Sequence, residues 1–362
     1  MKTPVGILGA TGMVGQHFIK FLIDHPWFEV TWVGASDRSA GKLYKDATQW
    51  RLDGVMPTNV AGLTVDECKP SEKAPKLMFS ATDASVATEI EQAFAKAGHV
   101  VVSNSKNHRM DPDVPLLVPE INADHLRLLP LQRKTRGWKG AIATNPNCST
   151  VALTMALGPL KKFGIKRVIC TTMQAVSGAG YPGVPSMDIL CNVVPYIGGE
   201  EEKMQVETQK IMGDFKKGAV IPLDARVSAS CNRVPSIDGH IVSVSVELEK
   251  KVTREKLLAA IAAYRGVPQE KGLPSAPAQP VQYLDAPDRP QPRRDAGREN
   301  GMVCFVGRLR ECPALDWKFT CLAHNTIRGA AGAGVLNAEL MKVEGLLDSL
   351  GDEVAKRLVG AA

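Results

Sequence analysis

The stretch that decides the fold is residues 5–16, VGILGATGMVGQ. An apolar run at its start is followed directly by Gly9, Gly12 and Gly15, and a helical period of apolar residues covers 13–24. Glycines at this spacing tighten a strand-to-helix turn, bring backbone amides close to a pyrophosphate and leave the helix N-terminus to meet its charge. The pattern is G-x-x-G-x-x-G, and its position after an N-terminal strand predicts nucleotide binding rather than a merely structural turn.

Strand-like and helix-like periods alternate outward from this loop. Strands are expected at 5–8, 29–34, 77–80 and 100–103, with helices at 13–24 and 84–97. Glycines between these segments punctuate the series as in the loops of a parallel sheet. The pattern predicts an α/β, Rossmann-like doubly wound sheet in an N-terminal domain over residues 1–147.

The pattern changes after residue 140. AIATN leads through PNCST into an apolar helix that Ser149 or a neighbour caps, which puts Cys148 at a helix N-terminus. Apolar and polar residues alternate over 242–249, and a second strand is expected at 315–324. We therefore expect an α+β domain over 148–325 with a mainly antiparallel sheet and one wet face.

Two segments near the end of the chain give further expectations. Seven prolines interrupt residues 268–292, a composition that opposes strand pairing and predicts a long surface loop or arm without a catalytic role. An Ala- and Leu-rich helix is expected at 329–350, packed back on the first domain, which residues 326–362 would complete.

Composition limits the classes of protein. The 362 residues suffice for about two domains, and the formal charge of +6 is spread along the chain, so nucleic acid is not the expected partner. Eight cysteines lie far apart without a C-x-x-C pair, which indicates reduced thiols and no metal site. No apolar run approaches the roughly 18 residues of a membrane span, and no leader pattern opens the chain, so we expect a cytoplasmic protein.

The end of the second strand bears on the choice of cofactor. There the sequence reads GASDRSAGK, in which Ser36, Arg38 and Ser39 suit a ribose 2′-phosphate. Asp37 opposes that choice if it points inward, because a carboxylate prefers the free 2′-hydroxyl of NAD. We expect Asp37 to face solvent and the cofactor to be NADP, the alternative being a solvated polar turn.

Two residue types suit covalent chemistry. Cys148 is a candidate nucleophile because a helix N-terminus favours the thiolate, with core packing as the alternative, whereas Cys170 and Cys321 lie in apolar strands and are expected to be buried. His240 begins the alternating strand, and Arg233 precedes it with a planar fork for a carboxylate. Taken alone, such a histidine is more often a surface or capping residue.

Motifs along nearly the whole chain carry a family resemblance. In order they are GATGMVG, SNSKNHRM, TNPNCST, TMQAVSGAGYPGVPS, PYIGGEEEKMQVET, NRVPSIDGH and AHNTIRGAAGAGVLNAELM. Together they resemble the aspartate-semialdehyde dehydrogenase family, in its archaeal and fungal branch. The resemblance implies NADPH-dependent reductive dephosphorylation of L-aspartyl-4-phosphate to L-aspartate 4-semialdehyde through a Cys148 thioester, a reaction of lysine, threonine, methionine and isoleucine biosynthesis.

The resemblance also implies a role for individual residues. Cys148 would be the nucleophile, His240 the general acid and base, and Gln174 the group that orients the acyl substrate. The substrate-binding residues would be Arg233 for the carboxylate, Glu200 for the ammonium group, and Lys203, Asn147 and Arg109 for the phosphate. NADP would contact Gly9, Thr11, Gly12, Met13, Val14, Ser36, Arg38, Ser39, Ser80, Ala81, Ser177, Gly178 and Asn325. A homodimer or homotetramer built through the second domain, with the proline-rich arm as an extra contact, would complete the enzyme.

Other functions share parts of this pattern. A malonyl-CoA reductase resembles it in thiol and cofactor, but its substrate lacks the ammonium group that Glu200 would bind. An N-acetyl-glutamyl-phosphate reductase matches the motifs less well, and a non-catalytic NADP-binding redox sensor would not need the full set of catalytic groups. Cys191 stands where relatives are expected to carry an acidic residue, and Cys191 and Cys231 would add thiols near the site that are open to oxidation.

Overall fold

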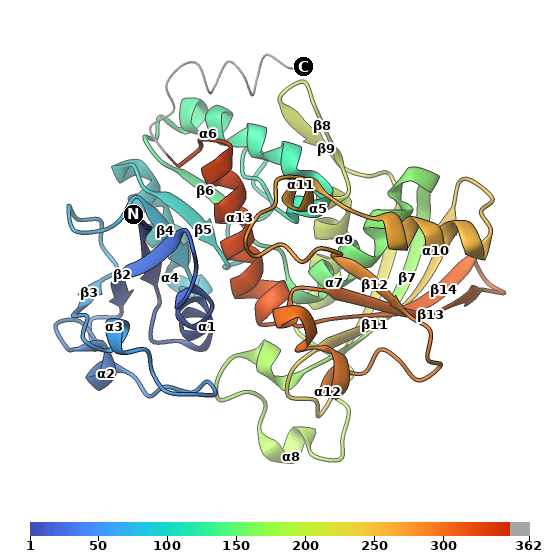
Figure 1. Ribbon diagram of the computed structural model, residues 1–362, viewed down its shortest axis with the longest axis horizontal. Coiled ribbons are helices and arrows are strands. Elements are labelled where there is room, and N and C mark those ends of the chain that lie inside the picture. Colours follow the sequence, from blue (N-terminus) through green and yellow to red (C-terminus); the bar gives the residue numbers. More distant parts are fainter. Residues whose placement is uncertain (348–362) are drawn as a thin grey trace.

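Two six-stranded sheets form the two halves of the computed structural model, which describes residues 1–347 (Figure 1). A small ribbon of β8 (Asp214–Lys216) and β9 (Ala219–Ile221) stands apart from both sheets. In Figure 1 helix α13 runs between the two halves. Helices therefore separate the sheets, and the two halves meet over side chains rather than through shared strands.

The first sheet is entirely parallel, with the strand order β3-β2-β1-β4-β5-β6. This is the order of the doubly wound dinucleotide-binding fold, so the predicted fold class of this half is confirmed. β4, β5 and β6 are buried along their whole length, as expected of strands covered on both faces. The strands are β1 (Thr3–Leu8), β2 (Phe28–Ala35), β3 (Val65–Glu67), β4 (Leu77–Ser80), β5 (Val100–Ser103) and β6 (Ala141–Thr144).

The predicted helices of this half are present with small differences at their ends. The helix expected at 13–24 ends at Leu22, and the one at 84–97 has the expected bounds. Asp83 caps the latter by accepting from the Ser85 amide, and Gly98 ends it in the left-handed conformation. The helices are α1 (Met13–Leu22), α2 (Tyr44–Ala47), α3 (Thr58–Ala61), α4 (Ala84–Ala97), α5 (Pro119–Asn122), η1 (Ala123–Arg127) and α6 (Leu128–Arg136).

The second sheet is mixed and largely antiparallel, with the order β10-β7-β11-β14-β13-β12. Its two outermost pairs are parallel and the inner pairs are antiparallel, so the expected α+β half is confirmed. Alternate residues of β11 are buried, and Cys170 and Cys321 lie in the core as predicted. The strands are β7 (Ile165–Gln174), β10 (Arg226–Arg233), β11 (His240–Leu248), β12 (Val281–Leu284), β13 (Cys304–Glu311) and β14 (Trp317–Ala323).

Helix α7 (Cys148–Leu157) is the central helix of this half, and every residue after Cys148 in it is buried. It packs with α9 (Glu200–Ile211) and α10 (Arg254–Ala263) over the apolar side of the sheet. The remaining helical segments are η2 (Gly158–Phe163), η3 (Val176–Ala179), α8 (Ser186–Ile189), α11 (Val267–Glu270), α12 (Pro292–Asp295) and η4 (Arg298–Gly301). This packing places the first turns of α7 and α9 at the boundary between the two halves.

The proline-rich segment contradicts the expectation of an unpaired loop or arm. Within it, β12 pairs in parallel with β13 at the edge of the second sheet, and Leu273 is buried in the first core. The prolines flank the strand, since Pro280 precedes it and accepts from the Cys304 amide through its carbonyl. An edge strand pairs on one side only, so neighbouring prolines do not prevent the ladder.

The C-terminal helix packs on the first half as expected, although its bounds differ. A π-helical turn, η5 (Ile327–Ala331), leads into α13 (Gly332–Val343), and residues 348–350 of the expected helix lie outside the described residues, as do 348–362 of the expected completing segment. Val335 and Leu336 belong to the same core as Phe18 of α1. Gly334 allows this approach, because a Cβ there would lie 2.8 Å from the Phe18 ring.

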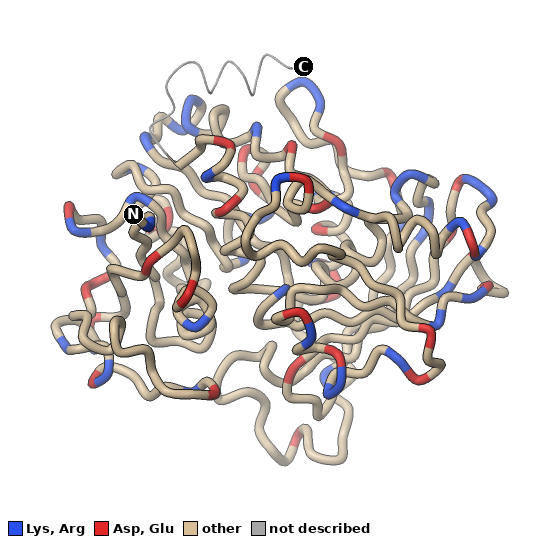
Figure 2. The backbone as a smooth tube through the Cα atoms, in the orientation of Figure 1, with Lys and Arg blue, Asp and Glu red and all other residues tan. Residues whose placement is uncertain are grey.

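Charge and cysteines are distributed as the composition suggests. Figure 2 shows Lys and Arg interspersed with Asp and Glu over the whole described backbone. All eight cysteines are free. Within residues 1–347, no helix combines the length and apolar character of a membrane span, and no group of three or more His, Cys, Asp or Glu is arranged to hold a metal ion.

Candidate active site

The glycine loop between β1 and α1 requires glycine at two of its three positions. Gly9 has φ +74°, and a Cβ on it would lie 2.5 Å from the Ala81 carbonyl oxygen. A Cβ on Gly15 would lie 2.4 Å from the Gly9 oxygen, whereas one on Gly12 would make an ordinary contact. No side chain caps α1 at Gly12. The loop therefore presents bare backbone and an uncapped helix start, which suits a phosphate group.

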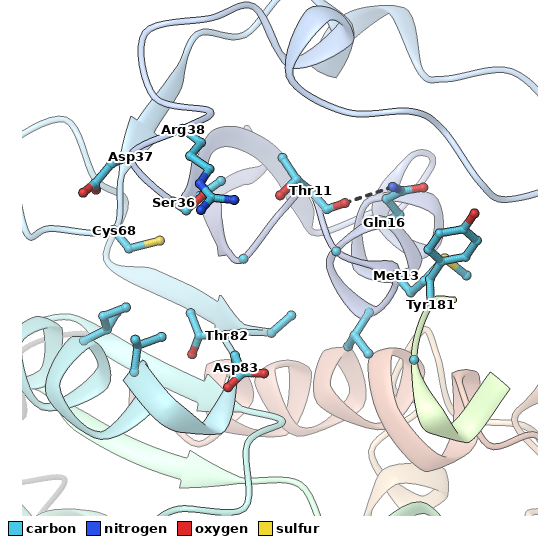
Figure 3. Close-up of a pocket in the computed structure, with 18 of the residues that line it drawn as sticks. Thr11, Met13, Gln16, Ser36, Asp37, Arg38, Cys68, Thr82, Asp83 and Tyr181 are labelled. Carbon is cyan, nitrogen blue, oxygen red and sulfur yellow. Dashed lines mark hydrogen bonds between the residues drawn. The ribbon is translucent and has the colours of Figure 1, made fainter. Parts of the chain in front are cut away.

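A cavity of about 990 Å³ opens in front of this loop (Figure 3). Eight residues predicted to hold a cofactor line it: Gly9, Thr11, Gly12, Met13, Val14, Ser36, Arg38 and Ala81. In Figure 3 the Arg38 guanidinium turns toward the Thr11 loop while the Asp37 carboxylate points the other way. The cavity is thus large enough for a dinucleotide and carries a cation where a 2′-phosphate would lie.

Several lining residues were missed by the sequence reasoning. Arg51, Lys69, Thr82, Asp83 and Tyr181 also line the cavity. The Arg51 guanidinium lies 3.6 Å from the centre of the Tyr181 ring, so a cation–π contact joins the two halves across the cavity. Both residues are on loops and come from distant parts of the chain. No local spacing signals such a contact.

Two predicted cofactor residues of the first half do not line the cavity. One is Ser39, which follows Arg38 in the chain and whose backbone amide donates to the Ser36 carbonyl. Ser80 is fully buried, and its hydroxyl donates to the Glu91 carboxylate 2.7 Å away. The side chain of Ser80 therefore supports the end of β4 from within the core.

The remaining predicted cofactor residues, Ser177, Gly178 and Asn325, belong to the second half and do not line the cavity either. Asn325 donates to the Ser177 hydroxyl at 2.7 Å and accepts from the Gly239 amide at 2.8 Å. A Cβ on Gly178 would lie 3.0 Å from the His240 ring. Ala179, Gly180 and Tyr181, which follow Gly178 directly, do line the cavity, so it reaches this segment of the second half.

Cys148 and His240 come together as the sequence predicts. The sulfur lies 3.1 Å from Nε2 of His240, although the two residues are far apart in the sequence. Asn147 is the cap of α7, since its Oδ1 accepts from the Ser149 and Thr150 amides. The cap fixes the first turn of α7 and with it the position of the sulfur.

The electrostatics of this pair correct one expectation. Burial, with the Glu200 charge nearby, raises the pKa of Cys148 to about 12, so the helix N-terminus does not produce a resting thiolate. Burial and the Arg233 charge lower the pKa of His240 to about 3. Nδ1 of His240 accepts from the Ala175 amide at 3.1 Å, which assigns the proton of the neutral ring to Nε2, facing the sulfur.

Glu200 is the centre of a hydrogen-bond network beside Cys148. Its carboxylate accepts from Asn147 Nδ2 at 2.7 Å, from Lys203 Nζ at 2.9 Å and from Gln174 Nε2 at 3.3 Å. Burial pushes the pKa of Glu200 up, but these hydrogen bonds outweigh it and hold the pKa below its ordinary value. Four of the predicted residues therefore form one hydrogen-bonded group.

Arg233 is a buried cation close to the Cys148–His240 pair. Its Nη1 donates to the Ala175 carbonyl at 2.8 Å, and the side chain is buried next to Gly178 and His240. This one contact leaves most of the guanidinium donors unused. A carboxylate bound there would lie close to the sulfur.

Arg109 is held by a residue that the sequence reasoning missed. Its Nη1 donates to Glu207 of α9 at 3.0 Å, and Glu207 also accepts from the Asn147 amide at 2.7 Å. The available signal was the spacing of Glu200, Lys203 and Glu207, which places them on one helix face.

The two extra thiols make no hydrogen bond to Cys148 or His240 among the described residues. Cys191 is exposed near α8, and Cys231 is buried with its sulfur 3.6 Å from Met204. Burial raises the pKa of Cys231 to about 11, which keeps it a thiol.

Comparison with known proteins identifies the family of this chain. Two family models match: the NAD binding domain of semialdehyde dehydrogenases over residues 4–129 and their dimerisation domain over 157–328. The aspartate-semialdehyde dehydrogenase of Methanothermobacter thermautotrophicus is 50% identical over 93% of this chain and 98% of its own length. The chain belongs to the aspartate-semialdehyde dehydrogenase family.

Other members of the aspartate-semialdehyde dehydrogenase family extend the likeness to fungi and to solved structures. The enzyme of Schizosaccharomyces pombe is 48% identical over 95% of this chain and 99% of its own. The Candida albicans enzyme, solved with NADP, superposes with a TM-score of 0.89 at 43% identity over 96% of this chain and 100% of that one. Aspartate semialdehyde dehydrogenase II of Vibrio cholerae, solved in complex with ASA, superposes with a TM-score of 0.74 at 27% sequence identity. The match covers 95% of this chain and 99% of that one.

Proposed function

We propose that this protein is an NADP-dependent, phosphorylating aspartate-semialdehyde dehydrogenase that works through a thioester on Cys148. It interconverts aspartyl phosphate and aspartate semialdehyde in amino-acid biosynthesis, as its family membership implies. The observation that carries the mechanism is the 3.1 Å contact between the Cys148 sulfur and Nε2 of His240.

The residues of the first half suit NADP. The bare glycine loop and the uncapped start of α1 would hold the pyrophosphate, and Arg38 with Ser36 would bind the 2′-phosphate. When bound, NADP takes up the hydride that leaves the substrate. The Candida albicans relative was solved with NADP. We also propose that residues 1–147 with 326–362 form the cofactor domain, and 148–325 the catalytic and dimerisation domain.

The second half supplies the groups for an amino-acid substrate. We assign Arg233 to the carboxylate, since its planar fork matches one, and Glu200 to the ammonium group, since it stays ionised. Gln174 would orient the carbonyl between them. The Vibrio cholerae relative forms a complex with ASA. A malonyl thioester has no ammonium group to pair with Glu200, so this carboxylate favours the amino-acid substrate.

The reaction follows from these positions. The Cys148 sulfur attacks the aldehyde carbon while the thiol proton passes to the substrate oxygen. The Nε2–H of His240 faces the sulfur and stabilises the negative charge that develops during this transfer. Loss of the hydride and of that proton gives the thioester. Phosphate held by Arg109, Asn147 and Lys203 then attacks the thioester carbonyl, and the carbon–sulfur bond breaks to return Cys148. The biosynthetic direction runs through the same steps in reverse.

The neutral resting pair has a consequence for this mechanism. Cys148 and His240 carry no charge at neutral pH, so the thiolate forms only as the bound carbonyl accepts the proton. Two nearby cations, Arg109 and Arg233, lower the energy of the negative charge that develops on the sulfur. The enzyme thereby avoids a permanently reactive thiolate.

We further propose a homodimer or homotetramer. Apolar side chains are exposed on the segment around α8, which projects from the second half in Figure 1. They are Tyr181, Met187, Leu190, Val193 and Tyr196, of which Met187 is 89% exposed. A second copy covering them would remove this surface from water, and the match to a dimerisation domain supports that reading. Eight free cysteines favour a reducing, cytoplasmic location.

The test is the cofactor and phosphate dependence of aldehyde oxidation. Purified protein with aspartate semialdehyde should reduce NADP at a rate that requires phosphate, and NAD should be a poorer acceptor. A parallel assay supplies malonate semialdehyde and CoA. Activity restricted to that second pair would overturn the assignment of Glu200 and Arg233.

A further inference from the structure

Glu207 is the buried carboxylate that joins the proposed phosphate ligands. We propose that it is a positioning residue that sets Arg109 and Asn147 for phosphate; the proposal rests on the phosphate site described above. Glu207 lies on the inner face of α9 and is 2% exposed. Its two oxygens serve different parts of the chain.

The first oxygen fixes a loop of the first half. Oε1 accepts from Nη1 of Arg109 at 3.0 Å, while Nη2 of Arg109 donates to the Asn104 carbonyl at 3.0 Å. Nε of Arg109 is buried without a hydrogen-bond partner in the part of the chain described. The guanidinium is therefore clamped at two nitrogens and still holds a buried donor that a bound anion can satisfy.

The second oxygen fixes the start of the nucleophile helix. Oε2 accepts from the Asn147 amide at 2.7 Å, and Nδ2 of Asn147 donates to Glu200 at 2.7 Å. The Asn147 Oδ1 is used in capping α7. The backbone amide, one N–H of Nδ2 and the Oδ1 of Asn147 thus have partners, and Glu207 and Glu200 of α9 hold its backbone and its side chain. The second N–H of Nδ2 can donate to phosphate. Cys148 follows directly in the chain.

Lys210, one turn further along α9, supports the same loop. Its ammonium donates to the carbonyls of Arg109, Asp111 and Val114 at 2.7, 2.8 and 2.9 Å. Three carbonyls use all three donors of the ammonium group. Glu207 therefore holds the side chain of Arg109 while Lys210 holds its backbone, so α9 sets the loop in both respects.

The placement explains why a negative charge stands beside an anion site. A free carboxylate there would repel phosphate, but both Glu207 oxygens already accept from a guanidinium and an amide. The charge of Glu207 orients Arg109 and is compensated by it. A displacement of about 1 Å at either ligand costs on the order of 100-fold in rate.

The main test is Glu207→Gln, with steady-state kinetics in all three substrates. The amide cannot accept from both partners, so KM for phosphate should rise roughly 10- to 100-fold and kcat should fall. KM for NADP should stay within about twofold, because no contact of Glu207 reaches the cofactor cavity. Glu207→Asp, which restores both acceptors at shorter reach, should recover part of the loss.

Two further variants distinguish a general loss of stability from an error in the proposed phosphate site. Glu339→Gln is the matched control: that carboxylate is also fully buried and accepts from His25 and Ser275, away from the site. It should lower Tm without changing KM for phosphate. Arg109→Ala tests the phosphate site itself, and an unchanged KM for phosphate there would refute the site on which the proposal rests.

The positioning role has its own contradicting result. If Arg109→Ala raises KM for phosphate but Glu207→Gln and Glu207→Asp do not, Glu207 is only a structural ion pair. An equal loss of kcat/KM for all three substrates in the Glu207 variants would also overturn it. Should Glu207→Gln fail to fold, Glu207→Asp and Lys210→Met carry the test, each expected to affect phosphate more than NADP.

Discussion

The glycine loop and the Cys148 region are both helix N-termini, yet they differ in almost every physical respect. The start of α1 has no side-chain cap and opens on a large cavity, whereas α7 is capped by Asn147 and closed in by carboxylates. The first therefore offers backbone donors to a ligand. At the second, the amides of Asn147, Ser149 and Thr150 already donate to side chains of the protein, and chemistry there depends on side chains from several segments.

This difference shows that burial and nearby charges decide whether a helix N-terminus stabilises a negative charge. Burial and the Glu200 charge raise the pKa of Cys148 to about 12 despite the helix. At the glycine loop no such burial opposes the amides. The comparison predicts that cofactor binding and thiol chemistry can be altered separately.

The largest effect is expected from Cys148→Ala. Turnover should fall by at least about 10³-fold, because no other group can form the thioester. The dissociation constant for NADP, measured by calorimetry, should stay within about twofold, since Cys148 does not line the cavity. Turnover near that of the parent would show that the sulfur is not the nucleophile.

The pH dependence of Cys148 alkylation tests its raised pKa. In the free enzyme the iodoacetamide rate should rise about tenfold per pH unit between about pH 6 and pH 9, as the thiolate fraction grows below a pKa of about 12. Mass spectrometry of the Cys148 peptide gives the rate. A plateau near neutral pH would instead indicate a resting thiolate–imidazolium pair.

Gly15→Ala should distort the glycine loop without changing the Cys148 region. The new Cβ would lie 2.4 Å from the Gly9 oxygen and 2.7 Å from the Ala10 Cα, so the backbone must shift at a cost of about 1–3 kcal/mol in unfolding free energy. KM for NADP should rise with it. Gly62→Ala, where a Cβ meets nothing within 4 Å, serves as the neutral control in the same melts.

Arg38→Gln should give the smallest effect of the four. KM for NADP should rise about tenfold, since one charge-assisted contact to the 2′-phosphate is lost from an exposed position. KM for NAD should hardly change. Asp37→Asn is the paired control, expected to change little because its carboxylate points away from the loop (Figure 3). Equal losses for both cofactors would remove Arg38 from the 2′-phosphate site.

The sequence predicted most reliably what depends on local spacing. The glycine loop, the parallel strands around it and the alternation in β11 follow from neighbours in the chain, and the structure confirms them. The prediction of an unpaired loop in the proline-rich segment was wrong because strand pairing there depends on a contact with a distant part of the chain. Its composition shows prolines but not that β13 lies beside Val281 to pair with it.

The parts of the site that the sequence missed depend on contacts between distant residues. Glu207 looks like one more charge on α9 until Arg109 and Asn147 reach it from other segments. The pKa of Cys148 likewise follows from burial, which no motif displays. The resemblance singled out Cys148 and His240 from the sequence, but their protonation states depend on burial and neighbouring charges that only the folded structure shows.

The central claim is that Cys148 carries an acyl thioester which phosphate resolves, and single-turnover trapping tests it most directly. Mixing enzyme with aspartate semialdehyde and NADP in the absence of phosphate should release about one NADPH per active site. Mass spectrometry should then find the acyl group on the Cys148 peptide, and added phosphate should remove it. A burst without any adduct on Cys148, or an adduct that persists with phosphate, would contradict the account.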